Sequence, residues 1–542
     1  MATSKEYAEF IRSKFERLDV VSIKPMMGEY VIHMAGKVLG FIGDEQLMLE
    51  PGPTIEQLLP DAEKRELFPG SKLFYIIDDG MSAMRLCEIA QAIYDDLPIS
   101  KPRKRKKDTR DEEIEKRFPF AKHIMHVLCC LLMLGSWGLK AQETELFKSI
   151  TAHLSSAEFQ GRGYAYNGVR RAGDYIFRQF RDAGVHHIEL QPFEIDINTF
   201  PGKMKMSVDG NKLEPGKDFV MREYSPGAKG EYKLFYIDTT GYDSEKLFDE
   251  LAKPENKGVF VVCDFWFTYK HKKDFRRLES KDGAPNAGVV YTWDTPLKFY
   301  KAYGEKVADK PIVWVSPDFP KDAKSIRLKV ENKFLEGYRS NNVIAKISGR
   351  RHDSCYVFTA HYDHLGNLGS KLYFPGANDN ASGTAAIITL AKYYAGNTPE
   401  YDMYFIAFSG EDTNLRGSTY FIEHPSFKLN SIKYLFNLDM VGDNNPVQYC
   451  EVSGPGLRGY AEMVGINAKK QLFKELKKGE LAANSDHWPF AQKGVPCILF
   501  ENESGDAFPY YHTAQDNMQH FFTCTYEALF KLITEFIRKN NK

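Results

Sequence analysis

The 542-residue sequence is poor in cysteine and contains no CxxC pair. Its eight cysteines are too few for a disulfide framework, which excludes the small scaffolds held together by disulfides. Five cysteines follow residue 141, so at least one of them should remain unpaired. Cys263, Cys355 and Cys497 lie in apolar, strand-like runs and are expected to be buried thiols.

The chain also lacks an excess of charge of either sign. Its 72 Lys and Arg residues almost cancel its 73 Asp and Glu residues, so there is no overall electrostatic basis for binding nucleic acid or a membrane surface. Instead, 43% of the residues are hydrophobic and 13% are aromatic, as in a globular protein with a large core. A chain of this length predicts roughly two to four domains.

The sequence has no apolar run as long as a membrane-spanning helix, which needs about 20 residues. A charged linker with a hydrophobic segment is predicted over residues 108–141, after the basic run KPRKRKK (Lys101–Lys107). Within it, Val127–Leu139 contains thirteen residues and no charge. This segment resembles the hydrophobic part of a secretory signal peptide, with Ala141 as the candidate last residue before cleavage.

Four interpretations of Val127–Leu139 stay open. It is an internal signal that exports everything after it to the periplasm or the outside, an uncleaved membrane anchor, the junction of two genes in one reading frame, or a short buried helix. The preceding basic run favours a signal, which would leave residues 1–107 in the cytoplasm. Membrane contact is expected only through residues 127–139.

Residues 1–107 form a separate compositional unit. The segment 4–18 has apolar residues at helical spacing, 29–50 alternates like a hairpin, and 83–97 predicts a closing helix. These patterns predict a small α+β domain without a cluster of ligating residues. The unit resembles the TfoX N-terminal domain family, named from regulators of bacterial competence, and MMGEY (Met26–Tyr30) is the most characteristic part of the likeness.

From residue 142 onward the pattern changes to alternating strands and helices. Short strands and turns over residues 200–335 interrupt it and predict a β-rich insertion. The C-terminal segment has the apolar face of a helix, formed by Tyr526, Leu529, Phe530, Ile533 and Ile537. Residues 142–199 and 336–542 are therefore predicted to form an α/β domain with a mixed, largely parallel sheet between layers of helices.

Several predicted strands and loops of this domain carry residues that can bind a metal ion. Ligands gather beyond the carboxyl ends of the strands in open α/β sheets. Buried carboxylates are costly unless they are paired or coordinate a metal, so acids at these positions indicate a metal site. The candidates are His361, Asp363, Asp379, Glu411, Asp412, Asp439 and His512.

A charge count divides the acids among roles. Two zinc ions carry four positive charges, which Asp379, Asp412, Asp439 and one hydroxide would balance, with Asp379 shared and two neutral imidazoles completing the ligand shells. Glu411 is then the surplus acid, and its natural role is that of general base.

Two further acids are predicted to orient the imidazoles. Asp363 follows His361 by two residues and is expected to accept its second N–H, which would fix the tautomer. Asp516 follows His512 by four residues and is expected to act in the same way.

The motifs TAHYDHLG, PGANDNASG, AFSGED, NLDMVG, NSDHWPF and YYHTAQD, in this order, resemble the di-zinc aminopeptidase family that also contains glutamate carboxypeptidase and, distantly, glutaminyl cyclase. The likeness spans about residues 145–542. It implies one zinc ion on His361, Asp379 and Asp439, and another on Asp379, Asp412 and His512. It also implies Glu411 as the base, a cis peptide between Asp379 and Asn380, and an insertion like the protease-associated domain.

One position departs from the family pattern. Most members have two consecutive glutamates where this chain has Glu411 and Asp412. Aspartate is one methylene shorter but still offers oxygen ligands, so two interpretations stay open: altered geometry with both ions retained, or loss of the second zinc ion.

The function expected from this likeness is that of a zinc-dependent aminopeptidase, which hydrolyses peptide bonds at the N-termini of peptides or proteins. One alternative is a glutaminyl cyclase-like acyltransferase, and another is a non-catalytic regulator or binding protein led by the TfoX-like domain. Five other histidines are expected to be surface or structural residues, and one of them, His487, to line the site without binding metal. The five are His153, His352, His364, His424 and His487.

Overall fold

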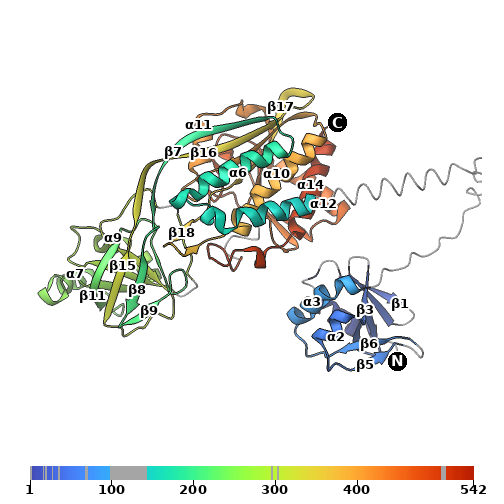
Figure 1. Cartoon of the computed structure of the whole chain (residues 1–542), viewed down its shortest axis with the longest axis horizontal. Helices are drawn as coiled ribbons and strands as arrows, with labels where there is room; N and C mark the ends of the chain where they lie inside the picture. Colours follow the sequence, from blue (N-terminus) through green and yellow to red (C-terminus); the bar gives the residue numbers. More distant parts are fainter. Residues whose placement is uncertain are drawn as a thin grey trace, which may run out of the picture. The chain divides into compact units, whose positions relative to one another are not determined.

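A computed structural model describes the chain as two compact units, residues 1–130 and 131–542 (Figure 1). The residues that it describes are 3–15, 18, 21–26, 29–34, 37–67, 71–97, 143–293, 297–301, 304–501 and 508–541. The signal-like segment 127–139 lies outside them. Within the described ranges, no helix is both long and apolar enough to cross a membrane.

The first unit is an α+β domain, as its sequence predicts. Its sheet is antiparallel throughout, in the order β1-β2-β3-β4-β6-β5. The Ser4 and Ser82 side chains accept hydrogen bonds from the first turns of α1 and α3, which fixes where these helices begin. The elements are α1 (Lys5–Lys14), β1 (Val21–Met26), β2 (Glu29–Met34), β3 (Lys37–Gly43), β4 (Gln46–Leu49), α2 (Pro53–Leu58), β5 (Lys64–Glu66), β6 (Leu73–Ile77) and α3 (Ala83–Ala92).

The second unit is built on a mixed sheet of eight strands in the order β23-β22-β24-β21-β17-β20-β16-β7. Its four central strands, β24, β21, β17 and β20, are parallel to their neighbours within this group. The predicted α/β class is therefore confirmed. The strands are β7 (His187–Thr199), β16 (Lys333–Ile347), β17 (Arg351–His361), β20 (Tyr401–Phe408), β21 (Ile432–Leu438), β22 (Val447–Val452), β23 (Glu475–Gly479) and β24 (Cys497–Glu501).

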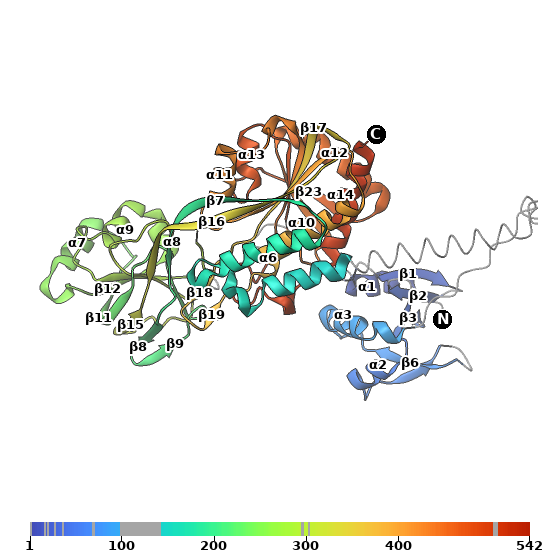
Figure 2. The same cartoon turned by 45° about the horizontal axis from the view of Figure 1, so that its top comes forward.

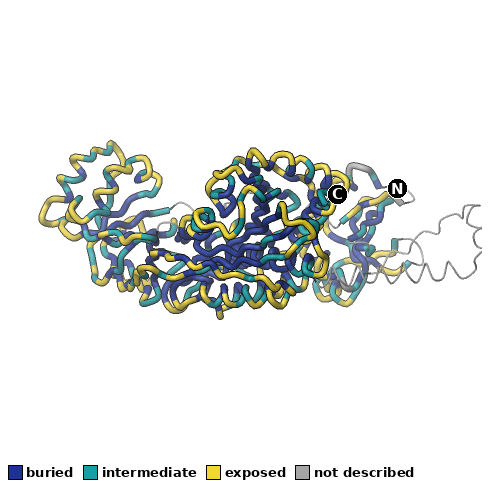
Figure 3. Tube along the Cα trace, turned by 90° about the horizontal axis from the view of Figure 1, so that it is seen from above, coloured by how far each residue is buried: buried dark blue, intermediate teal, exposed yellow. Residues whose placement is uncertain are grey.

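Helices cover both faces of this sheet (Figure 2). Successive strand residues point to opposite faces: Tyr356 and Phe358 pack in the larger core, whereas Cys355 and Val357 pack in a smaller one. Figure 3 shows the buried residues gathered in the interior and the exposed ones on the outside. The larger core holds the helical residues 143–154 with α6 (Gly168–Asp182), α10 (Gly383–Gly396), α12 (Leu457–Lys470) and α14 (Cys524–Asn540), and the smaller one holds α11 (Arg416–Glu423) and α13 (His487–Gln492).

The segment between β7 and β16 forms a second sheet of eight strands with its own core (Figure 1). It is richer in helix than the sequence pattern suggested, because its described residues include three short α-helices between the strands. The first, α7, begins where the Asp243 carboxylate accepts N–H bonds from Glu245 and Lys246. The three helices are α7 (Ser244–Ala252), α8 (Phe265–Lys270) and α9 (Lys272–Glu279).

The strands of this second sheet are mostly short, and some of them are parallel. Their order is β10-β14-β13-β12-β11-β15-β8-β9. They are β8 (Met204–Val208), β9 (Asn211–Leu213), β10 (Phe219–Met221), β11 (Ala228–Tyr236), β12 (Phe260–Asp264), β13 (Gly288–Thr292), β14 (Ile312–Val315) and β15 (Ser325–Val330). The long strands β7 and β16 pair antiparallel from His187 with Lys346 to Thr199 with Lys333, so the insertion joins the first eight-stranded sheet through a two-stranded ribbon.

The predicted thiols Cys263, Cys355 and Cys497 are buried and free.

Candidate active site

The parallel strands at the centre of the sheet bring the predicted residues to one edge. His361 is the last residue of β17, Asp439 directly follows β21, and Glu411 and Asp412 follow β20 by a short turn. Because these strands are parallel neighbours, their carboxyl ends lie side by side. Asp379 reaches the same place from the loop that precedes α10.

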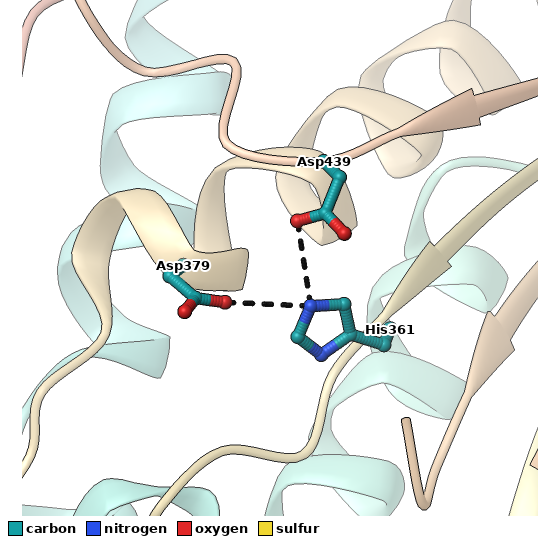
Figure 4. Close-up of side chains that lie close together, drawn as sticks. All are labelled: His361, Asp379 and Asp439. Atoms are coloured by element: carbon teal, nitrogen blue, oxygen red, sulfur yellow. Dashed lines mark ion pairs between the residues drawn. The ribbon is translucent and has the colours of Figure 1, made fainter. Parts of the chain in front are cut away.

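Asp379 and Asp439 converge on the imidazole of His361 (Figure 4). The His361 Nε2 atom lies 3.4 Å from Asp379 Oδ1 and 3.4 Å from Asp439 Oδ1. All three side chains are buried. The other Asp439 oxygen accepts a hydrogen bond of 2.6 Å from the Ser485 hydroxyl, which leaves Oδ1 directed at the cluster.

A second group of donors surrounds the other oxygen of Asp379. His512 Nε2 lies 3.2 Å from Asp379 Oδ2 and 3.6 Å from Asp412 Oδ1. His364 Nδ1 lies 3.3 Å from Asp412 Oδ2 and 3.9 Å from Asp379 Oδ2. Neither of these two Oδ2 atoms has a hydrogen-bond partner in the described part of the protein, and the same is true of both ring nitrogens of His364.

These distances fit coordination of a metal better than hydrogen bonds. Two atoms about 2.0–2.1 Å from one tetrahedral zinc ion are about 3.4 Å apart, and the donor pairs that include His361 and His512 lie between 3.2 and 3.6 Å. Buried carboxylate and imidazole atoms without hydrogen bonds, directed at a common point, are what a metal ion would satisfy. The side chains of another group also lie close enough together to hold a metal ion: His361, Glu411 and Asp412.

Glu411 borders both donor groups. Its Oε2 lies 3.9 Å from His361 Nε2. Burial raises the pKa of Glu411 well above its ordinary value of 4.5, against the effect of His361, and Asp412 and Asp439 raise it further. Its main-chain N–H donates a 3.1 Å hydrogen bond to Asp363 Oδ1. A carboxylate with a raised pKa is suited to take and return a proton near neutral pH.

Asp363 is placed differently from its predicted role. Its carboxylate lies 3.9 Å from His361 Nδ1, whereas the Asp363 main-chain carbonyl lies 3.1 Å from that nitrogen. The carbonyl is therefore the acceptor that orients the imidazole. The carboxylate instead accepts hydrogen bonds from the Glu411 N–H and from the Tyr164 hydroxyl, at 2.9 Å. Asp363 thus positions Glu411 through the main chain.

The predicted contact between Asp516 and His512 is also wrong. The Asp516 carboxylate accepts N–H bonds of 2.8 Å from Asn378 and 2.9 Å from Asp379, so it holds the loop that carries Asp379. Within the described ranges, His512 Nδ1 has no hydrogen-bond partner. The Asp379–Asn380 peptide is cis, as the family likeness implied.

Arg162, which the sequence did not single out, also holds the loop that carries Asp379. It is fully buried, and burial lowers its pKa to about 10, so it stays charged at neutral pH. All five of its N–H groups donate to main-chain carbonyls, which is the full capacity of a guanidinium. The acceptors, at 2.6 to 3.1 Å, are Leu154, Tyr362, Pro375, Gly376 and Asp379.

A cavity of about 250 Å³ opens over the donors. Its lining includes Tyr300 of the insertion, and the Phe299 N–H donates to the His512 carbonyl at 3.2 Å, so the insertion forms part of the site. Burial raises the pKa of another lining residue, Glu501, to about 9, with Asp439 and Glu451 adding to the effect. The lining residues are Tyr300, His361, Asp379, Glu411, Asp439, Met440, Asn484, Glu501, Tyr511 and His512.

Two of the remaining histidines lie deep in the protein. His364 is buried among the donors, although the sequence indicated only a surface or structural residue. His487 is buried, and its Nε2 lies 3.3 Å from Glu451 Oε2, outside the set of residues that line the cavity.

Comparisons with known proteins agree with this site. Residues 342–537 match the profile of Peptidase family M28. The chain is 31% identical over 350 residues to aminopeptidase YwaD of Bacillus subtilis, an alignment that covers 61% of this chain and 72% of the relative.

Solved structures show the same fold. The crystal structure of BSAP, a zinc aminopeptidase from Bacillus subtilis, matches with a TM-score of 0.56 and 21% identity, over 73% of this chain and 95% of that one. An aminopeptidase from Aneurinibacillus sp. strain AM-1 matches with a TM-score of 0.53 and 22% identity, over 73% of this chain and 93% of that one. Fold and site together define a metallopeptidase of the α/β class. The chain belongs to peptidase family M28.

A separate relative is an uncharacterized 12.7 kDa protein of Spirochaeta aurantia. It is 31% identical over 110 residues, which are 20% of this chain and 96% of the relative.

Proposed function

We propose that this protein is a zinc-dependent aminopeptidase that removes residues from the N-termini of peptides. The observation that carries the proposal is the position of Glu411, a partly buried acid with a raised pKa, at the border of two groups of metal donors beneath an open cavity. The relative YwaD is named an aminopeptidase, which supports cleavage at the N-terminus of the substrate.

Zinc would supply Lewis acidity here, polarising the scissile carbonyl and making water nucleophilic near neutral pH. The protein's own groups would move the proton. Glu411 takes it from the attacking water and delivers it to the leaving amine. Asp363 holds the Glu411 main chain through the 3.1 Å hydrogen bond, so the base keeps its place between the donors.

We propose two zinc ions, because Asp379 presents its oxygens to two different sets of donors. One set is His361 and Asp439: the His361 Nε2 atom lies 3.4 Å from Asp379 Oδ1 and 3.4 Å from Asp439 Oδ1. The other is His512 and Asp412, around Asp379 Oδ2. In the second set, His364 lies beside Asp412 and adds a fourth donor.

The proposed function is tested with the purified full-length chain and aminoacyl p-nitroanilides. Release of p-nitroaniline should stop after treatment with a chelator and return when zinc is added. Two zinc ions per chain are expected by elemental analysis. Hydrolysis that survives complete removal of metal would contradict the proposal.

Replacing His364 with alanine is expected to weaken binding of the second zinc ion at least about tenfold, because the ion would lose a donor that stands beside Asp412. Zinc occupancy would be measured by titration with a metal indicator, independently of hydrolysis. The first ion, on His361 and its partners, should bind as in the wild type.

The matched control is His187→Ala, which removes an exposed imidazole at the start of β7. It should leave both affinities unchanged. If His364→Ala also binds two zinc ions with wild-type affinity, His364 is not a donor to the metal.

The N-terminal part of the chain extends the proposal. We infer that residues 1–107 are a TfoX N-terminal-like domain, supported by the sequence likeness and by the α+β fold of the first unit. We further propose that the segment 127–139 directs the peptidase unit across a membrane, by export or as an anchor, on the basis of its composition and the basic run before it.

A further inference from the structure

The insertion between β7 and β16 contains a cavity of about 150 Å³ that the proposed chemistry does not use. Residues of α8 and α9 form much of its lining, and β13 and β14 contribute Tyr291 and Trp314. Six of its eleven lining residues are aromatic, so a ligand would bury apolar surface there. We call this cavity the insertion pocket, and its aromatic lining consists of Tyr224, Phe265, Tyr269, Phe275, Tyr291 and Trp314.

The insertion pocket has a surplus of positive charge. Arg222, Lys272 and Arg276 line it, and Glu279 is the acid among its lining residues. A further acid, Glu223, pairs with Arg222 at 2.9 Å. Three cations therefore face two acids, and neither Lys272 nor Arg276 forms an ion pair with an acid in the described part of the chain. These two exposed cations are available to an anionic ligand.

Trp314 adds a hydrogen-bond donor to the pocket. Its indole Nε1 atom is buried and has no hydrogen-bond partner among the described residues. The guanidinium carbon of Arg222 lies 3.8 Å from the centre of the Trp314 ring, so a cation is stacked against the indole. A buried N–H group without an acceptor is costly, and a carboxylate oxygen would accept its hydrogen bond. Aromatic walls, unpaired cations and this donor together fit a carboxylate attached to an apolar group.

One ring separates the insertion pocket from the metal donors. The centre of the Trp314 ring lies 6.5 Å from that of Tyr300, which also lines the catalytic cavity, and the Tyr300 ring lies 4.9 Å from the ring of His512. An extended peptide advances about 3.3–3.6 Å per residue. A substrate with its scissile bond at the donors would therefore reach Trp314 with roughly the third or fourth residue beyond that bond.

We propose that the insertion pocket binds a carboxylate of the peptide substrate, roughly three to four residues beyond the scissile bond, and thereby favours peptides that carry a negative charge at that distance. This inference rests on the proposed peptidase function. Two groups have the required chemistry: the C-terminal carboxylate of a short peptide, and the side-chain carboxylate of an aspartate or glutamate in a longer one. The aromatic walls would cover the apolar part of the residue that carries the charge.

The test compares two forms of one pentapeptide on the zinc-loaded full-length chain: Leu-Ala-Ala-Ala-Phe with a free C-terminal carboxylate, and the same peptide with a C-terminal amide. We expect kcat/KM for removal of leucine to be about 5- to 10-fold higher for the free acid. A third peptide, the amide of Leu-Ala-Ala-Asp-Phe, identifies the source of the charge. Recovery of the rate shows that a side-chain carboxylate is also bound, and no recovery restricts the pocket to the C-terminus.

The double variant Lys272→Gln/Arg276→Gln removes two exposed cations of the pocket, so the fold should be retained. The ratio of kcat/KM between free acid and amide should fall at least about threefold, and a general change in activity or zinc content cancels in this ratio. Lys273→Gln, an exposed position of α9 outside the lining, is the control and should keep the wild-type ratio. A wild-type ratio near one, or a ratio that the double variant leaves unchanged, would overturn the inference.

Binding without hydrolysis separates this inference from the proposed function. The N-acetylated pentapeptide has no free N-terminus to be cleaved, and calorimetric titration should show its free acid binding about 5- to 10-fold more tightly than its amide. If the wild type cleaves no peptide but shows this preference, the proposed function fails and the inference stands. If it cleaves both pentapeptides equally and binds both blocked forms equally, the function stands and the inference fails.

Discussion

Replacing Glu411 with glutamine is expected to lower kcat by about 10²- to 10⁴-fold, the range typical of general acid–base groups. Glutamine fills the same space but cannot accept the proton from water, so the chemical step slows while the fold is retained. The main-chain hydrogen bond from residue 411 to Asp363 does not depend on the side chain and should persist. The measurement is kcat on an aminoacyl p-nitroanilide at saturating zinc.

Zinc content distinguishes the role of base from that of ligand. Because Glu411 is grouped with His361 and Asp412 as a possible donor set, loss of one zinc ion in Glu411→Gln would make it a ligand instead. Two retained ions with abolished turnover would make it the base. Glu423→Gln, an exposed acid on α11, is the control and should keep wild-type kcat.

Replacing Arg162 with leucine is expected to destabilise the peptidase unit by at least about 3 kcal/mol, because each buried acceptor left without a donor costs about 1–3 kcal/mol. Five carbonyls would each lose the hydrogen bond from the guanidinium at once, among them that of Asp379, although the Gly376 carbonyl would keep an N–H donor from Ala381. The shift would be measured as the change in urea-unfolding midpoint of the zinc-loaded chain.

Arg162→Lys separates charge from hydrogen bonding. Lysine keeps a positive charge but has three donors instead of five, so its loss of stability should be smaller than that of the leucine variant. Arg178→Leu, at an exposed position of α6, should be close to neutral. A wild-type unfolding midpoint in Arg162→Leu would show that solvent or rearranged donors replace the guanidinium.

The fold and much of the candidate site could be predicted because their signals are local. His361, Glu411 and Asp439 each lie at or just after the carboxyl end of an apolar strand, and parallel strands bring such positions to one edge of the sheet. The alternation that separates Tyr356 from Val357 on the two sheet faces is likewise a property of one strand.

The missed features depend on contacts between distant segments. Arg162 lies in a glycine-rich loop, and its partners are main-chain carbonyls, which carry no side-chain signature. His364 stands three residues after His361, beyond the strand, where the direction of the chain decides whether a side chain faces the site. Only the folded loop brings it to Asp412.

Local signals were also present but overlooked. The α7 helix carries an N-cap at Asp243 and buried Leu247 and Leu251 one turn apart, yet it is short and lies between two strands. The partners predicted for Asp363 and Asp516 were wrong for another reason. Sequence spacing does not show what else lies close in the fold: the Asp363 carbonyl lies nearer to His361 than its carboxylate does, and the Asp516 carboxylate accepts N–H bonds from Asn378 and Asp379.

The ribbon formed by β7 and β16 has a consequence for how this protein can diversify. Thr199 and Lys333 face each other across it, so the chain leaves the catalytic sheet and returns to it at the same place. Segments of different length can be exchanged there during evolution without shifting the register of any catalytic strand. All metal donors come after Lys333, whereas Tyr300 belongs to the exchangeable part. Selection can therefore alter which substrates are accepted while the catalytic machinery stays as it is.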